Sequence, residues 1–530
     1  VAELVRRLDI PYIAVVPGAS YRGFQDSLVN YLGNRDPQML VCLHEEHCVA
    51  IAHGYAKVTD KPMAAAVHSN VGLMHATMAV FDAWCDRAPV MVFGATGPVD
   101  AALRRPWIDW IHTSRDQGAL VRDYVKWDDQ PGSSEAAIES VLRANRIMRR
   151  HPQGPVYIVL DVAMQESKLD PVPEIPDVAR YAVEPDPAPT TESVTAALGM
   201  LKSATSPLIM VGRVSRNQAD WDRRIAFAEA LGANVITNQR IAAAFPTHHP
   251  LHPNHLNYRT TAEDEALIRE ADVILNLDWL DFGGTINAAG GVGAKIVSIS
   301  MDDLNSNGWS FDHHVLPAVD LPILATPDSF VASALLQLAA GEKRTYSITP
   351  SAPPTGSGAI DLVSLGTAVD AAIGERPTTY VRLPIGWPAP TIRIDGPLDY
   401  IGNDGGAGVG SGPGMVVGSA LALQGSGRLP VAIMGDGDFL MGVSALWTAA
   451  HYGIPLLLII NNNRSYGNDV AHQSRMAIQR GRPVENRWIG QSLENPRVDI
   501  PAQARSYGVS AGETVRDLKD LMPALEAGIK

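Results

Sequence analysis

Short apolar runs alternate with segments of helical spacing along the first third of the chain. Within residues 1–165, the runs predict buried strands and the segments between them predict helices. The expected strands are Tyr12–Val16, Met39–Cys42, Met63–Val67, Val90–Gly94 and Val156–Val162, and the expected helices are Gly23–Leu32, Glu46–Val58 and Leu73–Cys85. Because alternating strands and helices pack as a parallel sheet covered on both faces, we expect a doubly wound α/β domain here.

Two proline-rich stretches divide the rest of the chain. Residues 166–192 are rich in proline and acidic residues, and residues 346–358 in proline, serine and glycine, which is typical of linkers. The strand–helix alternation continues between them with the runs LIMVG, ANVIT, VILNL and KIVSIS. The sequence therefore predicts an α/β fold of three doubly wound parallel-sheet domains, at residues 1–165, 193–345 and 359–530.

The third domain contains a β-α-β unit with polar residues at both strand ends. It predicts a strand, a turn, a helix and a second strand at Val431–Met434, Gly435–Gly437, Gly442–Tyr452 and Leu456–Ile460. Parallel strands bring Asp436 and Asn463 side by side beyond their carboxyl ends, where open sheets bind ligands. Carboxylate, amide and carbonyl oxygens suit Mg²⁺ that carries a phosphate group. Gly437 and a helix beginning near Asp438 would favour such a phosphate.

The spacing of these residues carries a family resemblance. A Gly-Asp-Gly turn alone is most often a plain strand-to-helix connection, but Gly-Asp-Gly followed by Asn-Asn across a β-α-β unit resembles the thiamine diphosphate signature of the benzoylformate decarboxylase and acetolactate synthase family. The resemblance implies that Asp436, Asn463 and Ser465 hold Mg²⁺, the last through its backbone carbonyl. It also implies that the three domains are pyrimidine-binding, middle and diphosphate-binding units.

The first domain carries the second part of this resemblance. Leu43-His44-Glu45-Glu46-His47, before a helix that contains Gly54-Tyr55-Ala56, is similar to the family's HE…GYA segment. The resemblance makes Glu45 the acid that protonates N1′ of the cofactor's aminopyrimidine, and such an acid must be buried to keep its proton. The alternative is a carboxylate that only stabilises the helix N-terminus, which we expect of Glu46.

Further site residues follow from the same resemblance. His68 follows the strand Met63–Val67, where benzoylformate decarboxylase-like enzymes have a proton-transferring histidine; the alternative is a capped loop residue. His112 and Gln117 are candidate substrate contacts, against plain loop packing. The polar segment 465–491 is expected to close over the site, with Asn468 and His472 facing the substrate.

The glycine-rich stretch Gly402–Gly418 lacks a G-x-G-x-x-G motif after a strand, so a dinucleotide site is disfavoured. We interpret it as backbone that lines the cofactor, with a helix Met415–Leu423 behind it. The residues expected beside the cofactor are Glu45, Gly386, Gly410, Ser411, Met415, Asp436, Gly437, Asp438, Asn463 and Ser465.

Three positions depart from the family. The apolar residue that wedges the bent cofactor aligns with Ser411, so Met415 or another residue would supply the wedge. The serine that follows Pro-Gly and binds the substrate aligns with Ala19, with Ser20 one residue later. The family's second active-site histidine aligns near Phe282. Ser20 and Phe282 are therefore candidate substrate positions, and the loss of two polar contacts argues against an aryl 2-oxo acid.

The resemblance implies an enzyme that uses thiamine diphosphate and Mg²⁺ to make or cleave a C–C bond next to a carbonyl. A 2-oxo acid decarboxylase or carboligase is expected first, and a diketone C–C hydrolase similar to cyclohexane-1,2-dione hydrolase is the alternative. A catalytically inactive binding protein of this fold is the alternative of another class, although Glu45 is retained. Relatives are homodimers or homotetramers with active sites shared between subunits, and some carry FAD in the middle domain, which nothing between residues 190 and 340 establishes here.

Composition limits the other functions. The 530 residues are 46% hydrophobic and 19% charged, as in an ordinary globular protein. The net charge of −14 argues against non-specific binding to nucleic acid or anionic membranes. No signal peptide or membrane-spanning run is visible, so the cytoplasm is the expected location. The chain opens and closes on expected helices, and we expect the natural protein to extend beyond both ends.

Two groups of residues with metal-binding side chains do not predict a metal site. Cys42, Cys48 and Cys85 lack metal-site spacing and lie in apolar surroundings, which predicts buried, reduced thiols. Four histidines lie in a proline-broken loop without helical or zinc-finger spacing, and we expect them to be solvated: His248, His249, His252 and His255.

Overall fold

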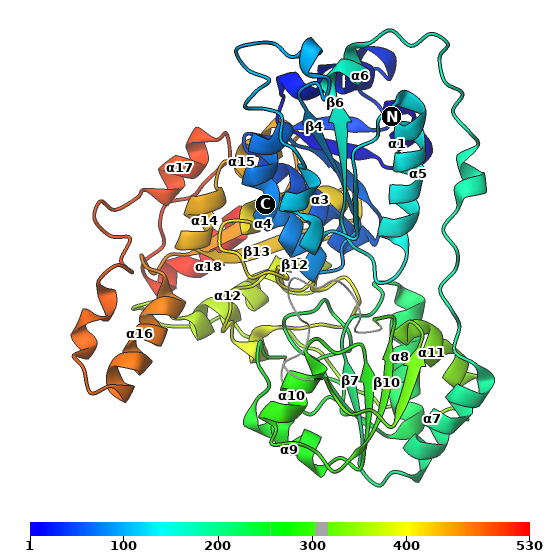
Figure 1. Cartoon of the computed structure of the whole chain (residues 1–530). Helices are drawn as coiled ribbons and strands as arrows, with labels where there is room; N and C mark the ends of the chain where they lie inside the picture. The colour runs from blue at the N-terminus through cyan, green and yellow to red at the C-terminus, as the bar shows by residue number, and fades with distance from the viewer. Residues whose placement is uncertain (255, 303–315) are drawn as a thin grey trace.

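The computed structural model describes residues 1–254, 256–302 and 316–530, which form three units, each built on a parallel sheet (Figure 1). The first sheet has the order β2-β1-β3-β4-β6-β5. Its strands are β1 (Tyr12–Val15), β2 (Gln38–Val41), β3 (Met63–Ala66), β4 (Val90–Thr96), β5 (Trp127–Asp129) and β6 (Val156–Asp161). Its helices are α1 (Ala2–Arg7), α2 (Arg22–Asp26), α3 (Glu45–Thr59), α4 (Ser69–Cys85), α5 (Ser134–Arg149) and α6 (Val162–Glu166). Apolar clusters on both faces of this sheet form the core.

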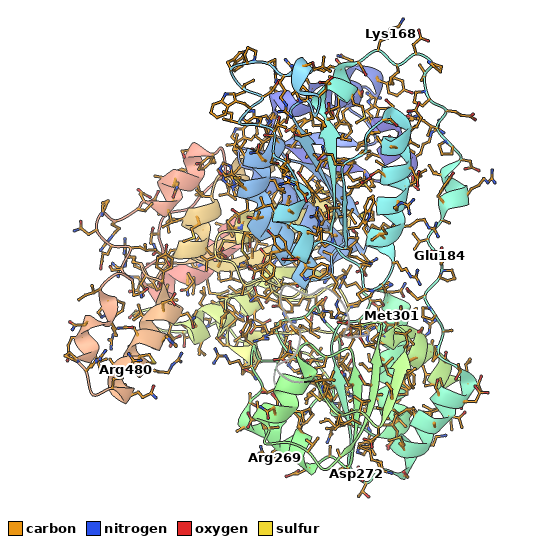
Figure 2. All side chains as sticks on the ribbon, viewed as in Figure 1. Lys168, Glu184, Arg269, Asp272, Met301 and Arg480 are labelled. Carbon is orange, nitrogen blue, oxygen red and sulfur yellow. The ribbon has the colours of Figure 1, made fainter. Side chains whose placement is uncertain are left out.

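The middle unit has a sheet of order β11-β10-β9-β7-β8. Its strands are β7 (Pro207–Val211), β8 (Asn234–Ile236), β9 (Val273–Leu277), β10 (Lys295–Ser300) and β11 (Leu321–Leu324). Its helices are α7 (Thr191–Ser203), α8 (Gln218–Leu231), α9 (Ala262–Glu270), α10 (Phe282–Ala288) and α11 (Pro327–Leu335). The segment before it, which includes Lys168 and Glu184, runs along the side of the first unit with one 3₁₀ turn (Figure 2).

The third unit contains the sheet β12-β13-β14, formed by Thr378–Arg382, Leu429–Gly435 and Leu457–Asn461. Its helices are α12 (Leu362–Ile373), α13 (Gly412–Ala422), α14 (Asp436–Gly442), α15 (Ala445–His451), α16 (Gly467–Gln479), α17 (Ile500–Ser506) and α18 (Leu521–Ile529). Figure 1 shows α16 on an arm that stands away from this sheet. Among the described residues, no helix combines the length and apolar character that a membrane crossing requires.

Helices α3 and α13 join the first and third units at very short range. A Cβ on Gly418 would overlap the carbonyl oxygen of Ile51, and a Cβ on Gly54 would overlap that of Met415. Glycine at both positions therefore lets the two backbones touch, which no larger residue allows without movement. This contact fixes the first turn of α3, with Glu45, relative to the third unit.

The predicted α/β fold is confirmed, with differences at particular elements. The sequence missed β5 and β11, which are both short, and the helix expected to begin near Asp438 is α14, which begins at Asp436. The expected helix Gly23–Leu32 is instead α2 followed by a π turn at Ser27–Tyr31, and α4 begins at Ser69, four residues before the expected start. Of the predicted thiols, Cys42 and Cys48 are buried and Cys85 is partly buried.

The expectation of a solvated histidine loop was wrong for two of its members. His249 is buried, accepts a hydrogen bond from the N–H of Leu251 and lies 3.3 Å from Glu229. His252 is also buried, with Nε2 2.9 Å from Oγ1 of Thr237. Both rings fill space under the loop, which the absence of helical spacing could not reveal. His248 is exposed, and His255 lies outside the described residues.

Candidate active site

Two predicted residues meet at the switch point of the first sheet. Strand order reverses between the neighbours β1 and β3, and ligands bind in the crevice that such a reversal opens. Ser20 follows β1 and His68 follows β3, and Oγ of Ser20 lies 2.8 Å from Nδ1 of His68. A Cβ on Gly18 would come within 2.5 Å of the same nitrogen, so this glycine gives the ring its place.

His112 completes this group from a loop that is anchored at two points. Its ring stands edge-on to that of His68, with the centroids 4.7 Å apart. The loop is held by a bond from the N–H of Gly97 to the His112 carbonyl and by a bond from Asn70 to the Ile111 carbonyl. Burial and the proximity of His112 lower the pKa of His68, while the Glu45 carboxylate acts in the opposite direction. His68 is therefore suited to accept a proton near neutral pH.

Glu45 is the first residue of α3 and is largely buried. Its Oε2 lies 3.1 Å from Nδ1 of His75, while its Oε1 lies over Gly72. The preceding His44 caps the helix by accepting the N–H of Glu46 at Nδ1. Burial and the nearby Asp438 of the third unit raise the pKa of Glu46. Glu46 therefore has surroundings beyond those of a plain helix N-terminus.

Asp436 ends β13 and begins α14, so its carboxyl sits at the tip of the sheet. Burial raises the pKa of this carboxyl group, whereas hydrogen bonds from the backbone N–H groups of Gly437, Asn463 and Arg464 act in the opposite direction. Its Oδ1 is buried with no hydrogen-bond partner in the described part of the chain. A buried carboxylate oxygen without a partner is costly unless a cation pairs with it, so this residue fits a Mg²⁺ ligand.

The loop after β14 brings the other two predicted ligands to the same edge. Oδ1 of Asn463 accepts hydrogen bonds from the N–H and the hydroxyl of Ser465, at 3.0 and 3.1 Å. Ser465 is buried and bridges to Ser492, which ties the loop to the arm. The predicted ligands are one carboxylate, one amide and one carbonyl. A cluster of three or more His, Cys, Asp or Glu side chains that could hold a metal is a different donor set, and the described residues contain none of that kind.

An ionic network ties the glycine-rich loop to the end of β12 and to the first turn of α14. Arg382, at the end of β12, pairs with Asp404 at 3.0 Å and with Asp438 at 2.7 Å. The N–H of Gly410 donates to Asp438 at 2.8 Å. Ser411, expected under the cofactor, instead directs its hydroxyl to Asp404 and to the Gly408 carbonyl. This loop is therefore held in shape before any ligand binds.

Several predicted residues lie elsewhere. Met415 is fully buried at the α3–α13 crossing, and Phe282 is buried in the core of the middle unit. Gln117 donates to the Ala95 carbonyl and to the Tyr157 hydroxyl, which favours the alternative of loop packing. Gly386 lies in an exposed turn with a φ of 82°.

The two candidates on the arm, Asn468 and His472, are exposed on α16. Figure 2 shows Arg480, just after this helix, at the outer end of the arm. The arm therefore stands open in the structure of the single chain.

A cavity of about 940 Å³ lies between the three units, at the switch point of the middle sheet. Its lining includes Lys57, Arg213, Asp278 and Asp404. The described residues that line it include none of the individual residues predicted for cofactor or substrate, although residues 403–407 of the glycine-rich stretch Gly402–Gly418 do line it. FAD in the middle unit stays an alternative that the sequence left open.

Sequence reasoning missed His75 and Arg382. His75 lies in the second turn of α4, 30 residues from its partner Glu45, and nothing in the local pattern distinguishes it from a surface residue. Arg382 is the last residue of the buried strand β12, and a charged residue at the carboxyl end of a buried strand was a signal that could have been used.

Three models of thiamine pyrophosphate enzyme domains match the chain. They are the N-terminal binding domain over residues 1–120, the central domain over residues 194–330 and the C-terminal binding domain over residues 385–530. Together they cover more than half of it. The chain belongs to the thiamine pyrophosphate enzyme family. Thiamine pyrophosphate is thiamine diphosphate under another name, so the family predicted from the sequence is confirmed.

Relatives extend along the whole chain. Benzoylformate decarboxylase of Pseudomonas aeruginosa is 23% identical over 515 residues, covering 96% of this chain and 92% of the relative. The acetolactate synthase large subunit of Parasynechococcus marenigrum is 26% identical over 548 residues, covering 99% and 85%. The crystal structure of benzoylformate decarboxylase from Polynucleobacter necessarius has a TM-score of 0.81 at 22% identity, covering 99% of this chain and 95% of that one. This likeness confirms the fold of this thiamine pyrophosphate enzyme.

Proposed function

We propose that this thiamine diphosphate enzyme depends on Mg²⁺ and acts in the cytoplasm on a small carbonyl compound, as a 2-oxo acid decarboxylase or carboligase. The buried, unpartnered Oδ1 of Asp436 beside the loop 463–465 carries the proposal, because it fits a cation that holds a diphosphate. The names of the relatives, benzoylformate decarboxylase and acetolactate synthase, support a 2-oxo acid substrate.

The cofactor, when bound, supplies a nucleophilic carbon and an electron sink for the bond next to a carbonyl. Asp436, Asn463 and Ser465 would hold Mg²⁺, which would neutralise the charge of the diphosphate. Glu45 would hold a proton toward the aminopyrimidine ring. His68 moves a proton to and from the reacting part of the substrate, and Ser20 and His112 keep its ring in place.

The site is completed by a second copy of the chain, as a homodimer or homotetramer. Four large apolar side chains next to predicted site residues are about half exposed in the single chain: Leu43, Met74, Val409 and Met441. Exposed apolar groups of this number around a cofactor site favour burial by a partner. Shared sites predict that two inactive variants complement each other. Mixed chains carrying Glu45→Gln and Asp436→Ala should regain activity, because one hybrid site contains both native residues; no recovery would overturn the sharing.

The function is tested by adding thiamine diphosphate and Mg²⁺ to the full chain and following cofactor circular dichroism. CO₂ release from pyruvate and benzoylformate is then measured beside cleavage of cyclohexane-1,2-dione. Cofactor binding with CO₂ release supports the proposal. Ring cleavage without CO₂ release would assign a diketone hydrolase instead, and no binding by the wild type would reject the cofactor site. Glu45→Gln should abolish turnover in a folded protein, and full activity of this variant would overturn the role of Glu45.

A further inference from the structure

His75 touches the carboxyl group on which the proposed function rests. Its Nδ1 lies 3.1 Å from Oε2 of Glu45, and among the described residues it is the hydrogen-bond partner of that side chain. The rest of the carboxyl is closely surrounded, because Oε1 would lie 3.1 Å from a Cβ on Gly72. The two oxygens of Glu45 are therefore not equivalent: one is engaged by a nitrogen, and the other lies over a glycine.

The position of the His75 ring is fixed by a second histidine. The rings of His44 and His75 stack with centroids 4.9 Å apart and an interplanar angle of 16°. His44 is itself fixed, because its Nδ1 accepts the N–H of Glu46 at the start of α3. Burial and the proximity of His75 lower the pKa of His44, so a neutral ring supports the stack. Nδ1 of His75 is thus held toward Glu45 by parts of both α3 and α4.

We propose that His75 is a positioning residue that places the acidic proton of Glu45 on Oε1. An N–H on Nδ1 donates to Oε2, and a carboxyl oxygen that already accepts a hydrogen bond is a poor place for the proton. The proton then resides on Oε1, from which Glu45 would donate it to a ring nitrogen of the bound cofactor and to which it would return. No other bond is made or broken in this step. The inference rests on the proposed function, since it requires Glu45 to face the aminopyrimidine.

The test uses cofactor activation rather than substrate turnover. The holoenzyme with thiamine diphosphate and Mg²⁺ is placed in D₂O, and the rate of hydrogen exchange at C2 of the bound cofactor is measured by quench and NMR. Binding of the cofactor to the apoenzyme is measured separately by calorimetry. His75→Leu removes the donor, whereas His75→Asn restores an N–H at the same position. His151→Asn is the matched control, because His151 also contacts a carboxylate, Asp186 at 2.8 Å, on an exposed surface.

We expect His75→Leu to slow C2 exchange at least tenfold with cofactor affinity within threefold of the wild type, and His75→Asn to recover exchange to within threefold. The control should change neither quantity. Unchanged exchange in His75→Leu would overturn the proposal, as would failure of His75→Asn to recover it. Loss of affinity in both variants would also overturn it, because His75 would then be a binding residue. If the wild type itself binds no cofactor, the proposed function fails, and this inference fails with it for that separate reason.

Discussion

The hydroxyl oxygen of Ser20 lies 2.8 Å from Nδ1 of His68, across the switch point of the first sheet. Ser20 is one residue beyond the position that the family resemblance assigns to a substrate-binding serine, and it is buried. Its hydroxyl contacts the His68 ring and can fix the orientation of that ring, which would leave Nε2 for the proposed proton transfer.

We expect Ser20→Ala to lower kcat about five- to tenfold and to leave KM nearly unchanged, since one hydrogen bond to the ring proposed to transfer protons is lost. Steady-state kinetics with the substrate found in the decarboxylation assay would measure both. Ser140→Ala is the control: this buried serine bonds to Asp129 away from the site, so kcat should not change. A rise in KM without a fall in kcat would mean that Ser20 contacts the substrate instead.

The sequence was informative where a residue is placed by its own strand. Asp436 and His68 directly follow apolar runs, so their positions at the sheet edges could be predicted. The same holds for Glu45, which directly precedes the predicted helix Glu46–Val58 and is the first residue of α3. In each case the chemistry follows from local pattern together with the topology of parallel sheets.

The sequence was less informative where the direction of a side chain and contacts distant in the chain decide its role. Gln117 and Phe282 were placed near a site by similarity, but a position in a loop or at a helix start does not say which way the side chain faces. Gln117 bonds within the first unit and Phe282 packs in the middle unit, and their substrate contacts stay predictions. His75 escaped notice because its significance depends entirely on Glu45, in another helix. The Ser20–His68 contact likewise required the two loops to be seen together.

Removal of Mg²⁺ should abolish cofactor binding. Chelation with EDTA, or Asp436→Ala, should lower the affinity for thiamine diphosphate at least a hundredfold in calorimetry, because the diphosphate loses its cation. Asp469→Ala is the control, since Asp469 is exposed in the first turn of α16 nearby.

Replacing Asp436 by asparagine instead of alanine tests a second expected effect, on the stability of the apoprotein. Burial raises the pKa of Asp436, so the charged carboxylate makes the folded apoprotein less stable. Asp436→Asn should therefore leave the apoprotein at least as stable as the wild type in urea unfolding. A clear loss of stability would show that this carboxylate has a structural role, and retained cofactor affinity would remove it from the metal site.

The close contact between α3 and α13 predicts that position 418 tolerates no side chain larger than that of glycine. Gly418→Ala would drive a methyl group into the Ile51 carbonyl and should destabilise the protein by about 1–3 kcal/mol. Gly199→Ala, in α7, meets open space and should stabilise it by about 0.5–1 kcal/mol. Urea unfolding followed by circular dichroism would measure both changes. Equal effects of the two substitutions would mean that the helices separate easily and that the close approach contributes little.

Protonation of His47 should lower the free energy of unfolding as the pH falls from 6.5 to about 4. Burial, and secondarily His44, lower its pKa to about 4, whereas an unfolded chain would have the ordinary value of 6.5. Between these pH values the unfolded state binds more protons than the native state, so the free energy of unfolding rises with pH across this window. The contribution is complete above pH 6.5 and is lost as the pH falls to 4, by about 3 kcal/mol in total.

His47→Gln isolates this contribution from those of other groups. Glutamine has no charge to gain and can still reach the hydroxyl of Ser444, which lies 2.8 Å from Nε2 of His47. The wild type should therefore lose stability relative to the variant as the pH is lowered from 7.5 to 5, in parallel urea titrations. If the difference in the free energy of unfolding between the two proteins stays constant over this range, His47 binds a proton as readily in the folded state as in the unfolded chain. That result would require water or a carboxylate to reach its ring.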